Sequence, residues 1–197
     1  MLTKHSLTLL FKEAFSSSIN LKQRSIDEHL ESMLAITAEI IKVFENNNKV
    51  LLCGNGGSAA DAQHIAAEWV TRYKINRKAL PALALTVNTS DLTAIGNDFD
   101  FNQIFSRQIE AHGKNGDLLI ALSTSGKSKN VINAVLEAKK MGITCVGLTG
   151  NNGGDLAEIC DISLIIPSDN TARIQEIHSL FMHAVCEAVD ESLFPVN

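Results

Sequence analysis

The spacing of apolar residues along the chain changes at about residue 49. Before that point apolar residues recur every three or four positions, until the polar stretch ENNNK at 45–49: Ile26, Leu30, Met33, Leu34, Ile40, Ile41 and Phe44. This spacing predicts amphipathic helices within residues 1–48. Because their apolar faces need a burial partner, we expect residues 1–48 to form a helical oligomerisation segment.

From residue 49 onward, five short apolar runs are each followed by a turn and a helical pattern. The runs are KVLLC at 49–53, LPALALTV at 80–87, DLLIALS at 117–123, ITCVGLTG at 143–150 and ISLIIP at 162–167. This alternation predicts an α/β fold in which residues 49–197 form one domain, a three-layer α-β-α sandwich around a five-stranded parallel sheet. A last amphipathic helix, with apolar residues from Ile174 to Val189, closes the domain.

Composition and charge limit the possible partners and location. The 197 residues are 45% hydrophobic, 20% charged and 5% aromatic, as in an ordinary soluble α/β protein. A formal charge of -5 without a basic stripe argues against a nucleic-acid partner. No apolar stretch reaches the roughly 18 residues of a membrane span, and the amino terminus lacks the apolar core of a signal peptide. The four cysteines form no CxxC pair, which indicates free thiols in a reducing compartment, so we expect a cytoplasmic protein.

Two turns rich in small residues follow the first and third predicted strands. In GNGGS at 54–58, the glycines let backbone amides approach an anion, and the following helix start adds unpaired N–H groups. Ser58 is a candidate N-cap of that helix, with Asp61 in the capping-box position. STSGKS at 123–128 adds four hydroxyls at the carboxyl end of its strand. Either turn alone is also consistent with an ordinary capped turn, but the pair in one sheet favours a phosphorylated small molecule.

Two helical ridges carry side chains that can ligate a metal. The helix after GNGGS presents His64, Glu68 and Arg72 at four-residue intervals, and the last helix repeats this spacing with Gln175, Ser179 and His183. If the ridges met, two imidazoles, one carboxylate and one amide oxygen would suit Zn²⁺ or a similar divalent ion. A solvated ion pair on one helix is the alternative, and sequence alone does not bring the helices together. His178 lies nearer the apolar face and is expected to be a packed or interface histidine.

Six stretches of the chain together resemble a known family. CGNGGS, DAQHIAAEWVTRY, GNDFDFNQIFSRQIEA, STSGKSKNVI, LTGNNGG and RIQEIH occur in the order found in the phosphoheptose isomerases of the sugar isomerase (SIS) domain superfamily, from about Lys49 to Leu193. The resemblance implies a flavodoxin-like SIS fold for residues 49–197 and a homotetramer. It also implies interconversion of sedoheptulose 7-phosphate and D-glycero-D-manno-heptose 7-phosphate, the first step of bacterial surface heptose biosynthesis.

The same resemblance implies site residues. One Zn²⁺ per subunit, or another divalent ion, is expected on His64, Glu68, Gln175 and His183. Isomerisation moves a proton between C1 and C2 through an enediol, so it needs a base and an acid; these are expected to be Glu68 and His183. Substrate contacts are expected at Asn55, Gly56, Gly57, Ser58, Glu68, Arg72, Asn97, Asp98, Ser123, Thr124, Ser125, Ser128 and Gln175.

Two features depart from this family or are shared with a relative. Lys127 stands in STSGKS where the family more often has a small polar residue. VNTSDLTAIGND at 87–98 and SLFP at 192–195 also resemble the DnaA initiator-associating protein, a non-catalytic SIS regulator. The positions corresponding to Glu68 and His183 are not kept in that regulator. Their presence here favours the enzyme.

Overall fold

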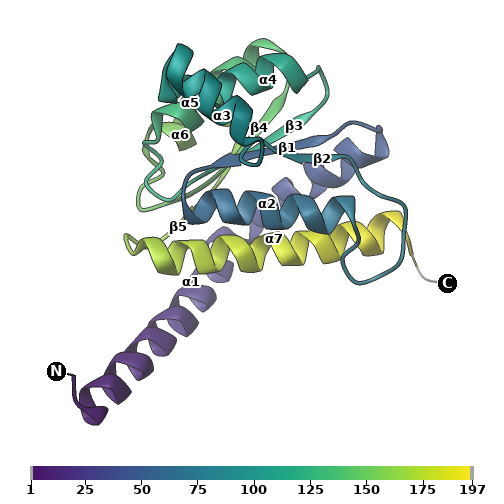
Figure 1. Cartoon of the computed structure of the whole chain (residues 1–197). Helices are drawn as coiled ribbons and strands as arrows, with labels where there is room; N and C mark the ends of the chain where they lie inside the picture. Colours follow the sequence, from purple (N-terminus) through teal and green to yellow (C-terminus); the bar gives the residue numbers. More distant parts are fainter. Residues whose placement is uncertain (1, 196–197) are drawn as a thin grey trace.

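Helices and strands alternate along the chain in the computed structural model, which describes residues 2–195 (Figure 1). The helices are α1 (Lys4–Glu45), α2 (Gly57–Val70), α3 (Thr89–Asp98), α4 (Ser106–His112), α5 (Lys129–Lys140), α6 (Gly154–Ile159) and α7 (Thr171–Leu193), with a 3-10 turn η1 (Phe101–Gln103). The strands are β1 (Val50–Gly54), β2 (Ala82–Ala84), β3 (Leu118–Ser123), β4 (Thr144–Gly150) and β5 (Ile162–Ile166). All five predicted strands are therefore confirmed.

The strands form one parallel sheet in the order β2-β1-β3-β4-β5. The chain order reverses between β1 and β3, which pair directly, with Gly54 opposite Leu122 at their carboxyl ends. In open parallel sheets the crevice outside the carboxyl ends at such a switch point is where ligands bind. The turns 54–58 and 123–128 therefore meet at the edge of the sheet where a site is expected.

Helices cover both faces of the sheet, which confirms the three-layer sandwich. α1, α2 and α7 lie on one face and α3 to α6 on the other (Figure 1). Successive strand residues point to opposite faces. Leu52 and Ile120 accordingly join the core under α1, α2 and α7, whereas Leu51 and Leu119 join the core under α4 and α5.

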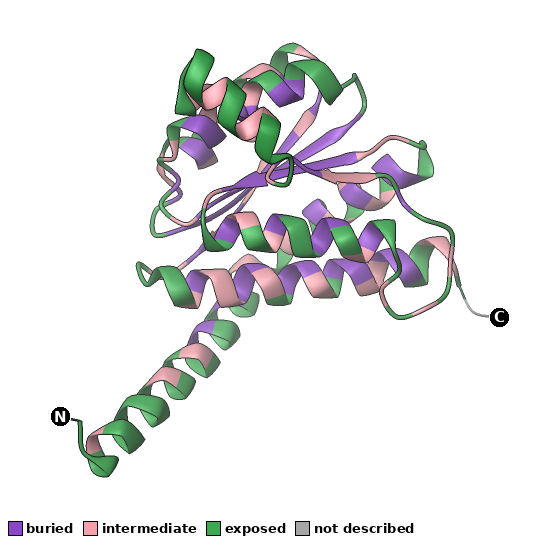
Figure 2. Cartoon of the chain, viewed as in Figure 1, coloured by how far each residue is buried: buried purple, intermediate pink, exposed green. Residues whose placement is uncertain are grey.

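The amino-terminal segment is α1, 42 residues long, in which two helical parts are joined at a kink. Its backbone departs from helical geometry at His29 (φ -131°, ψ 15°). After this point Ile36 and Ile40 are fully buried in the core against α7 and β5. Before it, α1 extends away from the sheet and exposes apolar side chains such as Phe11 and Phe15, which are 60% and 71% exposed (Figure 2). Leu21 and Ser25, which precede the break, are buried as well, so α1 joins the core from about Leu21 onward and its first turns do not.

The cysteines and His178 behave as ordinary core residues. The cysteines are free thiols, and burial raises the pKa of Cys145, Cys160 and Cys186 to about 12. His178 is fully buried; burial lowers its pKa to about 4, so the neutral ring donates from Nε2 to the Thr149 carbonyl at 3.0 Å. The predictions of free thiols and a packed His178 are confirmed. None of the helices described in the structure combines the length and apolarity of a membrane span.

Candidate active site

A polar pocket lies at the carboxyl ends of β1 and β3. It has a volume of about 290 Å³, and both predicted turns contribute to it. Two of its serines, Ser58 and Ser123, are buried, with only 3% and 4% of each residue exposed. The lining consists of Asn55, Gly56, Gly57, Ser58, Leu122, Ser123, Thr124, Ser128, Thr171 and Gln175. Eight of these ten residues were predicted as substrate contacts, whereas Leu122 and Thr171 carry no distinctive sequence signal and were missed.

The first turn differs from the predicted cap. α2 begins at Gly57, and its N-cap is Gly56, whose φ of 57° and ψ of -121° favour glycine. Ser58 is therefore inside the helix, and its side chain does not cap it. The Asp61 carboxylate accepts a hydrogen bond from the Ser179 hydroxyl at 2.6 Å instead of completing a capping box. The capping prediction was wrong, and the Ser58 hydroxyl is left to face the pocket.

Three helices start at the pocket, which gives it a positive potential. The first residues of α2, α5 and α7 lie at or beside its lining. Side chains do not cap α2 or α5, whereas Asn170 caps α7. Unpaired N–H groups at helix starts attract anions. Among the described residues, those that line the pocket carry no formal charge, so backbone amides and hydroxyls are the groups that the lining offers to an anion.

The second turn is held by hydroxyl contacts and by a close backbone approach. Ser123 donates to the Ser128 hydroxyl at 3.0 Å, and the Lys127 amide donates to Ser125 Oγ at 3.2 Å. Gly126 has φ 64°, and a Cβ there would lie 1.9 Å from the Gly153 carbonyl oxygen. Ser125 and Lys127 are exposed and do not line the pocket in the described structure.

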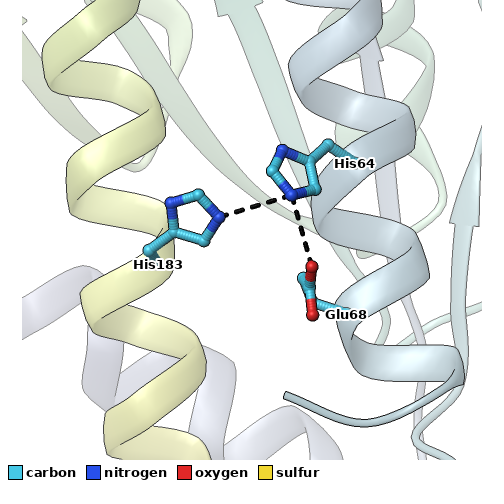
Figure 3. Close-up of side chains that lie close together, drawn as sticks. All are labelled: His64, Glu68 and His183. Atoms are coloured by element: carbon cyan, nitrogen blue, oxygen red, sulfur yellow. Dashed lines mark hydrogen bonds and ion pairs between the residues drawn. The ribbon is translucent and has the colours of Figure 1, made fainter. Parts of the chain in front are cut away.

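The ridges predicted on α2 and α7 meet beyond this pocket. The two helices pack against each other and bring His64, Glu68 and His183 together (Figure 3). His64 Nε2 is 3.2 Å from Glu68 Oε1 and 3.4 Å from His183 Nε2. Tyr73 stacks on the His183 ring, with centroids 5.9 Å apart. The His64 and Glu68 side chains are 50% and 25% exposed, so the cluster opens to solvent.

The cluster fits a divalent transition metal. One ligand atom from each residue lies within 4.8 Å of the other two. Ligand atoms about 2.0–2.1 Å from a tetrahedral Zn²⁺ are about 3.3 Å apart, which is close to the two separations measured at His64. Two imidazole nitrogens and one carboxylate oxygen are also donors that such ions prefer. His64, Glu68 and His183 therefore form a possible three-ligand metal site.

Gln175 does not join this cluster within one protomer. It lies beside the first turn, where a Cβ on Gly57 would be 2.6 Å from its Nε2 atom. Gln175 precedes His183 by eight residues on the same helix, or about 12 Å at ~1.5 Å per residue. In the protomer it is therefore a pocket residue. Its predicted role as a metal ligand stays a prediction.

Arg72 lies outside the helix that was predicted to carry it, because α2 ends at Val70. The carbonyls of Glu68 and Trp69 accept hydrogen bonds from the Arg77 guanidinium, at 3.0 and 2.8 Å. Arg77 thus satisfies carbonyls of the last turn of α2 that have no partner within the helix, and α2 ends before it reaches Arg72. The predicted three-residue ridge was thus wrong at its last member, and sequence reasoning missed Arg77.

Asn97 and Asp98 lie at the end of α3, on the opposite face of the sheet from α2 and α7 (Figure 1). Both are exposed, and the Asn97 amide donates to Asp98 Oδ1 at 2.8 Å. Neither lines the polar pocket in the part of the chain that the structure describes. Their substrate contacts stay predictions.

Comparison with known proteins identifies the family. The SIS domain family matches residues 14–150. The phosphoheptose isomerase of Clostridium acetobutylicum is 51% identical over 180 residues, 90% of this chain and 92% of that relative. The chain belongs to the phosphoheptose isomerase family. The Campylobacter concisus member of the family is 50% identical over 186 residues, 93% of this chain and 98% of its own length.

Solved structures of the phosphoheptose isomerase family share the whole fold. The enzyme from Francisella tularensis matches with a TM-score of 0.91 at 37% identity, over 97% of this chain and all of its own. The Neisseria gonorrhoeae enzyme matches with 0.89 at 42% identity, over 94% and 99%. The predicted family, SIS fold and isomerase class are confirmed, against the alternative of a non-catalytic regulator. The predicted boundary at residue 48 stays a prediction.

Proposed function

We propose that the protein interconverts sedoheptulose 7-phosphate and D-glycero-D-manno-heptose 7-phosphate, the first step of bacterial surface heptose biosynthesis. The observation that carries this proposal is that the α2–α7 pair joins a polar pocket to a His–Glu–His cluster. About half of the residues are also identical to those of phosphoheptose isomerases over about nine-tenths of the chain.

The pocket is proposed to hold the substrate phosphate. Its hydroxyls from Ser58, Ser123, Thr124 and Ser128 can donate to phosphate oxygens, and the helix starts add backbone N–H groups. A phosphate fixed there leaves the sugar carbons to extend along the α2–α7 pair toward His183 and Glu68. Binding at this remote group orients the carbons where the proton moves.

The cluster is proposed to exchange protons with the bound sugar. The Glu68 carboxylate takes the proton from C1 of the ketose and returns it to C2, while the His183 ring transfers a proton between the two oxygens. Because Glu68 has two carboxylate oxygens, one can face the carbon while the other remains near His64. A divalent ion held by His64, Glu68 and His183 would polarise the substrate oxygens.

The complete site is proposed to form between subunits of a homotetramer. Gln175 as a fourth metal ligand, and Asn97 and Asp98 as sugar contacts, would have to come from neighbouring copies. The first part of α1 offers an apolar surface for such assembly, which includes Leu7, Leu10, Phe11, Phe15 and Ile19. Sedimentation should give a tetramer, and Phe11→Ser/Phe15→Ser should weaken it. A wild-type monomer at assay concentration would contradict this assembly.

An isomerase assay with and without chelator tests the reaction class and the metal together. The protein should convert sedoheptulose 7-phosphate to the aldose, lose activity with chelator and regain it with one equivalent of Zn²⁺ or another divalent ion. Glu68→Gln and His183→Ala should each lower kcat by at least about 100-fold. Turnover that survives both substitutions would refute the assigned acid and base. Turnover that is indifferent to metal removal would refute the metal site alone.

A further inference from the structure

Asn130 is a buried amide that joins the two turns of the polar pocket. It lies in the first turn of α5, two residues after the N-cap Ser128, and is only 3% exposed. It does not itself line the pocket within the described structure. Its side chain instead contacts Asn55, a lining residue that follows β1. Asn130 therefore acts on the pocket through Asn55.

The two amides form a reciprocal pair. Asn55 Nδ2 donates to Asn130 Oδ1 at 2.9 Å, and Asn130 Nδ2 donates to Asn55 Oδ1 at 2.8 Å. Asn130 Oδ1 also accepts from the Val131 amide at 3.0 Å, so both of its lone pairs are used. Turning the Asn130 amide over would place its NH₂ group against two donors. Its orientation is therefore fixed by the backbone of α5.

This fixed orientation determines what Asn55 presents to the pocket. With one Nδ2 hydrogen and Oδ1 directed to Asn130, the second Nδ2 hydrogen of Asn55 is free to donate to a ligand. The Asn55 carbonyl also accepts from the Ser58 amide at 3.0 Å and so begins α2. A rotated Asn55 would present its oxygen, which repels an anion.

We propose that Asn130 is a positioning residue for the substrate phosphate: it orients Asn55 so that an N–H group faces the phosphate oxygens. This inference rests on the proposed phosphate role of the pocket. Asn130 touches neither the substrate nor the His–Glu–His cluster, so it sets phosphate affinity and leaves the proton transfer unchanged.

Inorganic phosphate as a competitive inhibitor of the isomerase is the direct probe. Asn130→Asp keeps the shape but replaces the donor to Asn55 Oδ1 with a carboxylate oxygen, so the reciprocal pair is broken, Asn55 loses its fixed orientation, and a negative charge is added behind the pocket. The inhibition constant of phosphate and the KM for sedoheptulose 7-phosphate should each rise at least tenfold, while kcat stays within threefold. Asn130→Ala, which only removes the support, should raise both about threefold.

Gln108→Ala is a matched control. Gln108 is also a buried amide, 5% exposed, and donates to the Leu85 and Ile104 carbonyls at 2.9 and 2.8 Å, away from the pocket lining. Its loss should lower the unfolding midpoint as Asn130→Ala does but leave the phosphate inhibition constant within twofold of wild type. An equal rise in this control would show a global effect and overturn the inference.

The positioning role of Asn130 and the phosphate role of the pocket can be refuted separately. If Ser123→Ala weakens phosphate but both Asn130 variants match wild type, the pocket stands and the positioning role of Asn130 is overturned. If phosphate does not inhibit the wild type and Ser123→Ala leaves KM unchanged, the phosphate role of the pocket falls, and the inference falls with it. A drop in kcat without a change in the inhibition constant would also overturn it.

Discussion

Gly57→Ala separates the stability of the protein from the geometry of its site. Gly57 is the first residue of α2 and does not have a positive φ, so alanine fits its backbone. Alanine also restricts the unfolded chain, so the free energy of unfolding should stay unchanged or rise by up to about 1 kcal/mol. The new methyl group, however, would lie 2.6 to 2.8 Å from the Nε2, Oε1 and Cδ atoms of Gln175.

The size of the effect follows from these distances. Non-bonded heavy atoms need about 3.5–4.0 Å, so the Gln175 amide must move by about 1 Å. A displacement of this size in a substrate-positioning group can lower the rate by up to about 100-fold. We expect kcat/KM to fall by about 10- to 100-fold, which is about 1.4–2.7 kcal/mol of transition-state stabilisation.

The assay is steady-state isomerisation in four proteins: wild type, Gly57→Ala, Gln175→Ala and the double variant. Because the methyl group acts through Gln175, Gly57→Ala should cost little further activity once Gln175 is alanine. Gly96→Ala is the control, since its methyl would meet only Ile104 at 3.9 Å and activity should be kept. Full activity in Gly57→Ala, or equal losses in both backgrounds, would refute the reasoning.

Three further substitutions test the fold around the site. The buried Asp190 carboxylate lies 2.7 Å from Arg77 Nε, and Arg77→Ala leaves it without its charge partner. The free energy of unfolding measured in urea titrations should therefore fall by about 3–5 kcal/mol, and a loss below about 1 kcal/mol would contradict this. His178 has a folded pKa of about 4 against 6.5 when unfolded, so the unfolded chain binds the proton more tightly and stability is lost as pH falls from 6.5 toward 4. Between pH 7 and pH 5 the wild type should lose about 2 kcal/mol more than His178→Gln, and parallel pH profiles would refute the assignment. Gly126→Ala should destabilise the fold by more than about 2 kcal/mol, because Gly126 has a positive φ and its new methyl group would contact the Gly153 carbonyl. Gly116→Ala should cost less, because its methyl group would meet only the Asn48 side chain. A Gly116→Ala variant that melts below Gly126→Ala would contradict this order.

The sheet could be predicted because its strands are buried on both faces. Runs such as DLLIALS are apolar at successive positions, which separates them from the amphipathic helices. The turns GNGGS and STSGKS could be placed in one pocket because β1 and β3 end at the same edge of the sheet. Local sequence and the rules of parallel sheets were sufficient for these features.

Contacts between distant segments could not be predicted from residue spacing alone; only the family resemblance placed His64 and His183 in one site. His64 and His183 are 119 residues apart, and only the packing of α2 on α7 places their rings together. The four-residue spacing continues to Arg72 in the sequence, but Arg77, which folds back from the next loop, takes carbonyls of the last turn of α2. The Asn55–Asn130 pair likewise joins residues 75 apart. In each case the missing information is a tertiary partner.

Three helices start at the pocket, and none of the described residues that line it carries a formal charge. These two features determine how anion binding there depends on pH. Backbone dipoles carry no ionisable proton, so the pocket in the described structure keeps its potential over a wide pH range. A phosphate monoester, by contrast, loses its second proton near pH 6. The pH dependence of phosphate affinity should therefore follow the ionisation of the ligand, so that acidification weakens binding without any change in the protein.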